Sequence, residues 1–351
     1  MDRKAKIVIA LAVAFSAAAG ILHYASINAV LGFVVTAGAL GLLAMLVGDA
    51  TEQLGSRLGP GATGVLQSSL GNLPELFVCI FALRAGLIGL VQAALVGSIL
   101  GNSLLVFGIA ILLGGIRNGT QTFHREPPKM IATLMILAVA ALMIPTLAKE
   151  LHTPASEHLN ALDAVCAFVL LALLAANTYF SIKGDPAVAN SAEDIGSPEW
   201  SLGLSIGVLA AAGLGAAFVS DWFVDALGPV MKTFGFSETF TGLVVVAVAG
   251  NSVENLVGIQ FAWRNQMNYG VSIMLNSSLQ IALGLIPMLV LISFLLGGTV
   301  LTLVLPPLLI AALALAAIVN AFIVYDGESI WLEGLALIGL YSIIAASFWW
   351  G

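Results

Sequence analysis

Eleven apolar runs, most of them about 20 residues long, follow one another along this chain with only short polar breaks. A run of that length crosses a lipid bilayer as one helix, because a helix satisfies its own backbone polar groups. The pattern therefore predicts an all-α polytopic membrane protein with about eleven transmembrane helices. The expected spans are approximately residues 7–23, 28–48, 63–84, 87–115, 129–148, 161–182, 200–224, 237–263, 267–297, 300–320 and 330–350.

The scarcity of charge supports the same class and excludes others. Only 9% of the 351 residues are charged, against about 25% in average soluble domains. This excludes a cytosolic enzyme, and the net charge of −7 speaks against a nucleic-acid partner. The two cysteines, Cys79 and Cys166, lie in apolar runs and are expected to be buried packing residues.

Lysine and arginine fix the expected orientation. If the N-terminus lies inside, nine of the twelve basic residues fall on the cytoplasmic side, and only Arg84, Lys149 and Lys232 fall outside. We therefore expect a cytoplasmic N-terminus and an external C-terminus. No long regulatory tail precedes the first span, so we expect a prokaryotic inner membrane rather than a vacuole.

The spans divide into an N-terminal helix at residues 1–26 and two units of five, at residues 27–182 and 200–351. Between the units, residues 183–199 are rich in Pro, Gly, Ser and acidic side chains, which indicates an acidic cytoplasmic linker. Because five is odd, the second unit must enter the membrane inverted relative to the first. Inverted repeats are typical of secondary transporters, whose substrate sites lie near the bilayer midplane where the repeats meet.

A polar motif recurs in the second span of both units. Each copy is followed one span later by a second polar patch, with 23 residues from Glu75 to Ser98 and 24 from Glu254 to Ser278. The paired motifs are Gly71-Asn72-Leu73-Pro74-Glu75 and Gly250-Asn251-Ser252-Val253-Glu254.

The two glutamates of this motif are expected near the bilayer centre. A carboxylate there costs about 2.5–3.5 kcal/mol, and no Lys, Arg or His lies at the same depth. A buried pair of carboxylates therefore requires a bound cation or protons. Asn72 and Asn251 precede their glutamates by three positions and so share a helix face with them.

The neighbouring groups suit a hard cation. Gly71 and Gly250 loosen the helices, so that backbone carbonyls can join the carboxylate and amide oxygens. Ca²⁺ takes 6–8 oxygen ligands, and this set supplies oxygens of the right kind. We therefore predict that Glu75 and Glu254 bind the metal ion.

Four residues of the second polar patches are expected to line the site: Ser98, Asn102, Ser278 and Gln280. Ser98 and Asn102 are spaced i, i+4 and therefore face one way, as do Asn276 and Gln280. Small polar residues also join membrane helices without binding any ligand, so a purely structural role stays open.

The segments Gly71 to Gly115 and Gly250 to Gly284 resemble the two signature regions of the calcium/proton exchangers in the calcium/cation antiporter superfamily. The resemblance implies eleven spans, an N-terminal helix followed by two inverted five-helix repeats. It also implies that Ca²⁺ and H⁺ compete for Glu75 and Glu254. The implied partners are these two ions and the lipid bilayer, with no resident cofactor and no enzymatic activity.

Departures from the family pattern define the alternatives. Pro74-Glu75-Leu76 resembles the sodium/calcium branch, so a Na⁺/Ca²⁺ exchanger is the main alternative and a cation channel a weaker one. The sodium branch places hydroxyl side chains where this chain has Gly71-Asn72 and Gly250-Asn251, and an acidic residue at Ala282. We therefore expect proton coupling. The sequence leaves open Ca²⁺ against Mn²⁺, the stoichiometry and a homo-oligomer.

Overall fold

The computed structural model describes residues 3–25, 28–58, 70–183, 199–298 and 300–350, and leaves aside the side chains of Lys4 and of residues 252–254. These ranges consist of helices joined by turns, with one pair of two-residue strands, β1 (Gln121–Thr122) and β2 (Glu328–Ser329). The strands are antiparallel, with Gln121 opposite Ser329. The expected all-α class is confirmed, while the expected linker at 183–199 lies almost entirely outside the described residues.

Seven helices in the described ranges are long and apolar enough to cross a membrane, or eight if one sharply bent pair counts as a span. A total of eleven is therefore not established by helix length. The long helices are α1 (Arg3–Ala25), α2 (Ala29–Leu58), α5–η1–α6 (Ile88–Leu100, Gly101–Val106, Phe107–Asn118), α7 (Glu126–Glu150), η2–α8 (Pro154–His158, Leu159–Lys183), α10 (Leu202–Phe234) and α14–η4–α15 (Met267–Gln280, Ile281–Leu285, Ile286–Leu295). The first part of the bent pair consists of α11 (Glu238–Phe240), η3 (Thr241–Val246) and α12 (Ala247–Gly250), and the second part is α13 (Ser252–Trp263). Three helices are shorter: α4 (Leu73–Arg84), α16 (Pro307–Ile323) and α17 (Trp331–Ser347).

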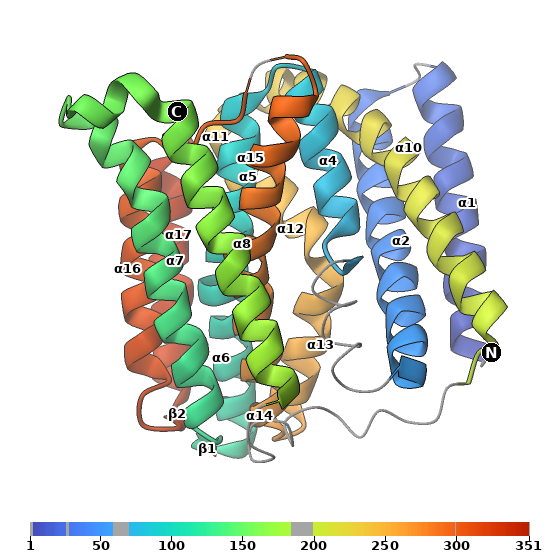
Figure 1. Ribbon diagram of the computed structural model, residues 1–351. Coiled ribbons are helices and arrows are strands. Elements are labelled where there is room, and N and C mark those ends of the chain that lie inside the picture. The colour runs from blue at the N-terminus through green and yellow to red at the C-terminus, as the bar shows by residue number, and fades with distance from the viewer. Residues whose placement is uncertain (1–2, 26–27, 59–69, 184–198, 299, 351) are drawn as a thin grey trace. The chain divides into compact units, whose positions relative to one another are not determined.

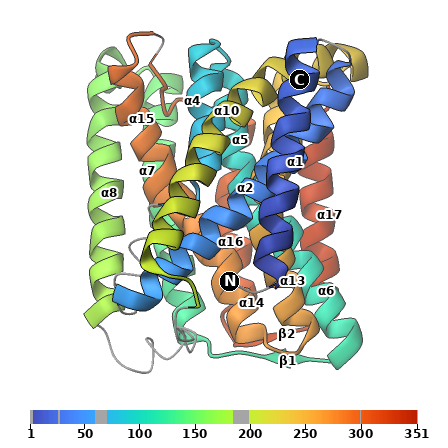
Figure 2. The same cartoon turned by 90° about the vertical axis from the view of Figure 1, so that its right-hand side faces the viewer.

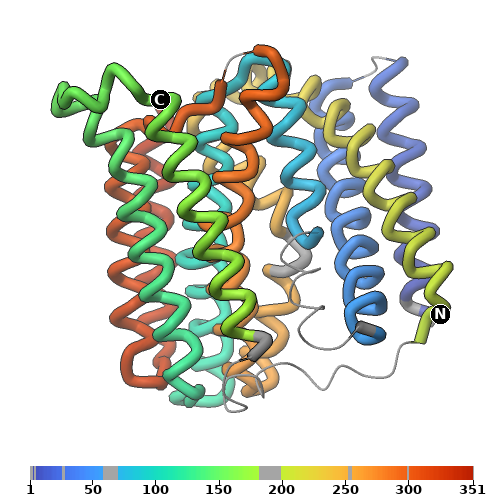
Figure 3. The backbone as a smooth tube through the Cα atoms, viewed as in Figure 1, coloured from blue at the N-terminus to red at the C-terminus, as the bar shows by residue number. Residues whose placement is uncertain are grey.

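The chain forms two compact units that are discontinuous in sequence. Unit 1 comprises residues 1–87 and 176–236, and unit 2 comprises residues 88–175 and 237–351. In unit 1, α2 packs against α1 and α10, and these three helices run alongside one another (Figure 1, Figure 3). In unit 2, α6 packs against α17 (Figure 2) and α7 against α16. Each of the proposed sequence repeats contributes helices to both units.

The expected span at 300–320 requires a correction, because α16 begins only at Pro307 and residues 301–306 are not helical. Two consecutive prolines explain the late start, since neither can donate a backbone hydrogen bond. The segment is nevertheless buried at Leu301, Leu303 and Leu305. Irregular backbone inside a membrane protein needs internal hydrogen-bond partners.

Polar side chains from four helices supply those partners. Ser293 accepts from the Leu301 amide at 2.9 Å, and Asp163 accepts from the Leu303 amide at 3.3 Å. Thr146 donates to the Leu303 carbonyl at 3.2 Å and accepts from the Leu305 amide at 3.0 Å. Gln92 donates to the carbonyls of Thr302 and Val304 at 2.8 and 3.1 Å. These buried polar residues are thus explained by the irregular segment that they hold.

Glycines let α5 and η3 meet at backbone distance. A Cβ atom on Gly97 would collide with the backbone of Leu243, and one on Gly242 would collide with the backbone of α5 at Leu90. Small residues at such crossings are typical of membrane helix packing. The close approach brings Ser98, the residue after Gly97, next to Asn251 at the break in the bent pair.

Candidate functional site

Two helices of 12 residues, α4 and α13, begin in the same way in the two halves of the chain. An asparagine precedes each helix, with φ −90° and ψ 19° at Asn72 and φ −104° and ψ 11° at Asn251. The carbonyl of each asparagine accepts a hydrogen bond from the amide four residues later, at 2.9 and 3.1 Å. Glu75 and Glu254 are the third residues of their helices. The repeated motif therefore forms the same local backbone twice.

One motif glycine lies at a helix break and the other lies directly before a helix. Gly250 is the last residue of α12, and the helix axis bends by 65° between residues 238–250 and 255–263. Gly71 lies in the turn directly before α4. A broken membrane helix presents free backbone groups and a helix N-terminus, whose positive dipole end favours negative side chains. Glu75 and Glu254 both belong to the first turn of their helices, α4 and α13.

Glu75 and Glu254 belong to different units, and the structure describes the side chain of Glu75 only. Glu75 is buried, with 5% of its surface exposed, and lies in unit 1. Glu254 belongs to unit 2, and its side chain is outside the described set. Their role as an ion-binding pair stays a prediction from the repeated sequence.

Unit 2 contains a buried cluster of four polar side chains that we call the Asn251 network. Asn251 donates to the Ser98 hydroxyl at 2.9 Å and to the Ala247 carbonyl at 3.1 Å. Asn102 donates to the Ser277 hydroxyl at 2.9 Å and to the Asn251 amide oxygen at 3.4 Å. The four members are 0–5% exposed. The network joins the polar patches of both halves of the sequence and brings Ser98, Asn102 and Asn251 together. Their role in lining an ion site stays a prediction.

The structure does not bring Ser278 into this network, because Ser277 occupies that position. Successive residues on a helix point about 100° apart. Ser278 therefore faces another way and donates to the carbonyls of Ile99 and Met274, at 3.4 and 3.2 Å. The signal for Ser277 was present in the sequence, since it follows Glu254 by the same 23 residues that separate Ser98 from Glu75. Gln280 is half-buried at the end of α14.

The network offers oxygen atoms in a buried environment. The Asn102 amide oxygen is buried and accepts no hydrogen bond from any described residue. Among the described residues, no group of three or more His, Cys, Asp or Glu side chains could hold a metal. Amide and hydroxyl oxygens suit hard cations rather than soft ones. Asn102 also belongs to the π-helix η1, and such segments occur frequently at functional sites.

Known proteins resemble this chain over almost its full length. Residues 28–183 and 204–350 match the family described as sodium/calcium exchanger protein. The chain is 34% identical to the Ca²⁺/H⁺ antiporter of Synechocystis sp., over 99% of this chain and 98% of that protein. It is 35% identical to the Ca²⁺/H⁺ antiporter ChaA of Bacillus subtilis, over 99% of both chains. The structure of native YfkE is similar, with a TM-score of 0.83, 31% identity, and coverage of 97% of this chain and 99% of that one.

Proposed function

We propose that this chain, which belongs to the sodium/calcium exchanger protein family, exchanges Ca²⁺ or a similar hard divalent cation for H⁺ by alternating access. The observation that carries the proposal is the helix start Asn-x-x-Glu, formed twice with the same backbone at Asn72 and Asn251. Relatives that are similar over 99% of the chain are named Ca²⁺/H⁺ antiporters, which supports the choice of ions.

In this mechanism Glu75 and Glu254 bind either the divalent cation or protons. Two ionised carboxylates leave an uncompensated double negative charge when no ion is bound, which is costly inside a membrane. One divalent cation removes that charge, and so do two protons. The loaded forms can therefore change their side of access at low electrostatic cost, while the empty form cannot. This difference couples the movement of the two ions.

The remaining predicted residues would complete the site with neutral oxygens. Asn72 and Asn251 contribute amide groups, and Gly71 and Gly250 contribute backbone carbonyls freed at the helix breaks. Ser98, Asn102, Gln280 and Ser278 stay in the proposed lining, to which the Asn251 network adds Ser277. Ca²⁺ needs 6–8 oxygens at about 2.3–2.6 Å, so the carboxylates alone would not complete its shell.

Sodium-coupled exchange is the second candidate, because Pro74-Glu75-Leu76 resembles the sodium branch of the superfamily. Against it stand Asn72 and Asn251, which occupy positions where that branch has hydroxyl side chains. The acidic residue of its second repeat is replaced by Ala282. Protons carried on the glutamates need none of these groups.

The repeat boundaries and the cellular setting belong to the same proposal. The N-terminal helix at 1–26, the repeats at 27–182 and 200–351, and the linker at 183–199 are supported by the correspondence of α4 with α13 and of η1 with η4. This integral membrane transporter would lie in a prokaryotic inner membrane with a cytoplasmic N-terminus. A homo-oligomer stays compatible with the proposal.

The test is uptake of ⁴⁵Ca²⁺ into liposomes that contain the purified full-length chain. We expect uptake driven by an imposed pH gradient and no uptake driven by a sodium gradient. Uptake driven by sodium alone would select the sodium branch. Downhill Ca²⁺ flux that needs no counter-ion would indicate a channel and refute exchange.

A further inference from the structure

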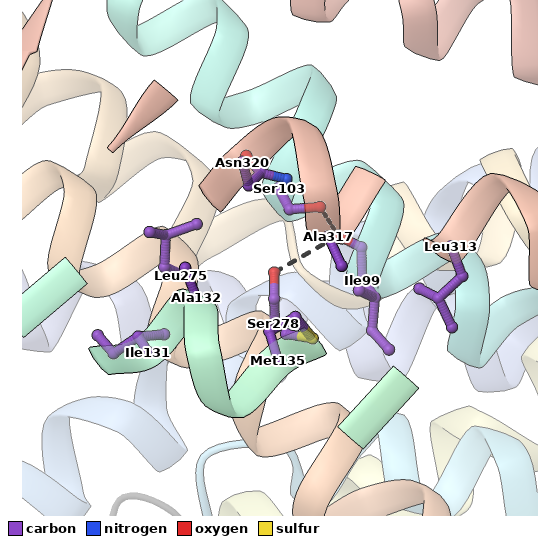
Figure 4. Close-up of a pocket in the computed structure, with 10 residues that line it drawn as sticks. All are labelled: Ile99, Ser103, Ile131, Ala132, Met135, Leu275, Ser278, Leu313, Ala317 and Asn320. Atoms are coloured by element: carbon purple, nitrogen blue, oxygen red, sulfur yellow. Dashed lines mark hydrogen bonds between the residues drawn. The ribbon is translucent and has the colours of Figure 1, made fainter. Parts of the chain in front are cut away.

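Unit 2 encloses a small cavity bounded by α5, η1, α7, α14 and α16, which we call the Asn320 cavity (Figure 4). Most of its ten lining residues are apolar, and they include Met135, Leu275 and Leu313. Three are polar: Ser103, Ser278 and Asn320. The space open to the centre of a water molecule is about 10 Å³. Room for one water requires roughly this volume.

The polar groups of the cavity are not all satisfied by the protein. Asn320 is only 4% exposed, and its amide nitrogen donates to the Ala316 carbonyl at 2.8 Å. Its amide oxygen is buried and accepts no hydrogen bond from the described residues. A buried acceptor left without a donor costs about 1–3 kcal/mol, so buried polar groups normally have a partner, in many cases an ordered water.

The two serines meet at one backbone carbonyl. Ser103 donates to the Ile99 carbonyl at 2.6 Å, and Ser278 donates to the same atom at 3.4 Å (Figure 4). Each hydroxyl oxygen can also accept a hydrogen bond. The cavity therefore combines one carbonyl-type acceptor with two hydroxyl oxygens, all of them uncharged.

We propose that the Asn320 cavity binds a single water molecule, which donates to the Asn320 amide oxygen and to a hydroxyl of Ser103 or Ser278. The small volume excludes a larger ligand, and the uncharged lining does not compensate the desolvation of an ion. A water with two to four polar partners is the ligand that such a site favours.

This water has a defined place relative to the Asn251 network. Ile99 follows Ser98 in the chain, and Ser103 and Ser278 follow Asn102 and Ser277. The water would therefore support the contact between α5, η1 and α14 from a different side than the network members, about 100° around each helix. The proposal does not depend on which ion the protein transports.

The direct test is an experimental structure of the full-length protein at about 2 Å resolution, determined with and without xenon pressure. We expect ordered solvent within hydrogen-bond distance of the Asn320 amide oxygen and no xenon in the cavity. Apolar cavities stay dry and bind xenon. Xenon in the unaltered protein would overturn the proposal, and so would a cavity that contains neither xenon nor water.

Variants give a second test that needs no structure. Asn320→Leu keeps the branched shape but removes the acceptor, and Ser103→Ala removes one hydroxyl. No hydrogen bond joins these two side chains in the described structure, so a shared water should make their effects on the melting temperature non-additive by about 2 °C or more. Ser342→Ala is the matched control, because Ser342 donates to the carbonyl four residues back at 2.8 Å but is exposed. Ser278→Ala, combined with Asn320→Leu in the same way, tests the second hydroxyl. Losses that are additive for Asn320→Leu with Ser103→Ala and also with Ser278→Ala would overturn the proposal, and the pair with Ser342→Ala should be additive in either case.

Discussion

Replacing Asn251 by leucine should destabilise the polar centre of unit 2 by an amount that its contacts define. Asn251→Leu keeps the side-chain shape but removes the hydrogen bonds to Ser98 and Ala247, at 2.9 and 3.1 Å. The contact with Asn102, at 3.4 Å, is too long to add much, and Asn102 keeps its bond to Ser277. At about 1 kcal/mol for each short bond, we expect a loss of about 2 kcal/mol. That corresponds to about 30-fold in the unfolding equilibrium.

The assay is SDS-induced unfolding followed by tryptophan fluorescence, carried out as a double-mutant cycle with Ser98→Ala. Because Asn251 and Ser98 share one hydrogen bond, the double variant should lose less than the sum of the two single variants. The coupling should be about 0.6–1 kcal/mol. Ser103→Ala is the control, because that serine bonds to Ile99 instead and its effect should add to that of Asn251→Leu. Additive losses for Asn251→Leu and Ser98→Ala would refute the network as described.

Three further predictions concern transport and the irregular segment. Glu75→Gln and Glu254→Gln should each abolish exchange in liposomes without loss of folded protein, because the amide removes both the charge and the titratable proton. Glu328→Gln, which changes an exposed residue of β2, should transport normally. Apparent Ca²⁺ affinity should fall as pH drops from 8 to 6, by up to ~100-fold per pH unit if two protons compete with each ion, and a flat titration would contradict proton coupling. Thr146→Val should cost about 2 kcal/mol of unfolding free energy, because it leaves the buried Leu305 amide and Leu303 carbonyl without this partner. Thr133→Val, on the exposed side of the same helix, should cost less than about 0.5 kcal/mol. Equal losses for the two variants would contradict the role of Thr146.

Hydropathy and the repeated motif predicted the features that depend on local sequence. Apolar length predicted the helices, because a chain in lipid must satisfy its backbone within each helix. The motif predicted that Asn72 and Asn251 would occupy equivalent places, and both precede a 12-residue helix in closely similar conformations. Burial of Glu75 followed from its position within an apolar span.

Features that depend on contacts between distant segments could not be predicted in this way. Residues 301–306 are as apolar as a helix, and only the prolines at 306 and 307 mark the boundary. The partners of the segment, Gln92, Thr146, Asp163 and Ser293, come from four helices scattered along the chain. The π-helical segments likewise have no local sequence pattern. Which of the two serines joins the Asn251 network, Ser277 or Ser278, depends on how α14 is rotated about its axis. The equal 23-residue spacing from Glu75 to Ser98 and from Glu254 to Ser277 nevertheless favours Ser277.

The repeat determines the backbone of the site more strictly than its side-chain contacts. Asn102 follows Ser98 by four residues, and Ile281 follows Ser277 by four, so Ile281 is the residue of the second half that corresponds to Asn102. The side chain of Ile281 cannot form hydrogen bonds. Asn251 can therefore be bonded by Asn102, but the equivalent partner for Asn72 does not exist in the sequence. If both repeats made identical contacts, Glu75 and Glu254 would have the same surroundings and would release their protons equally easily. Here the surroundings of the two motifs differ in chemistry, so we expect protons to leave Glu75 and Glu254 in an ordered way rather than interchangeably.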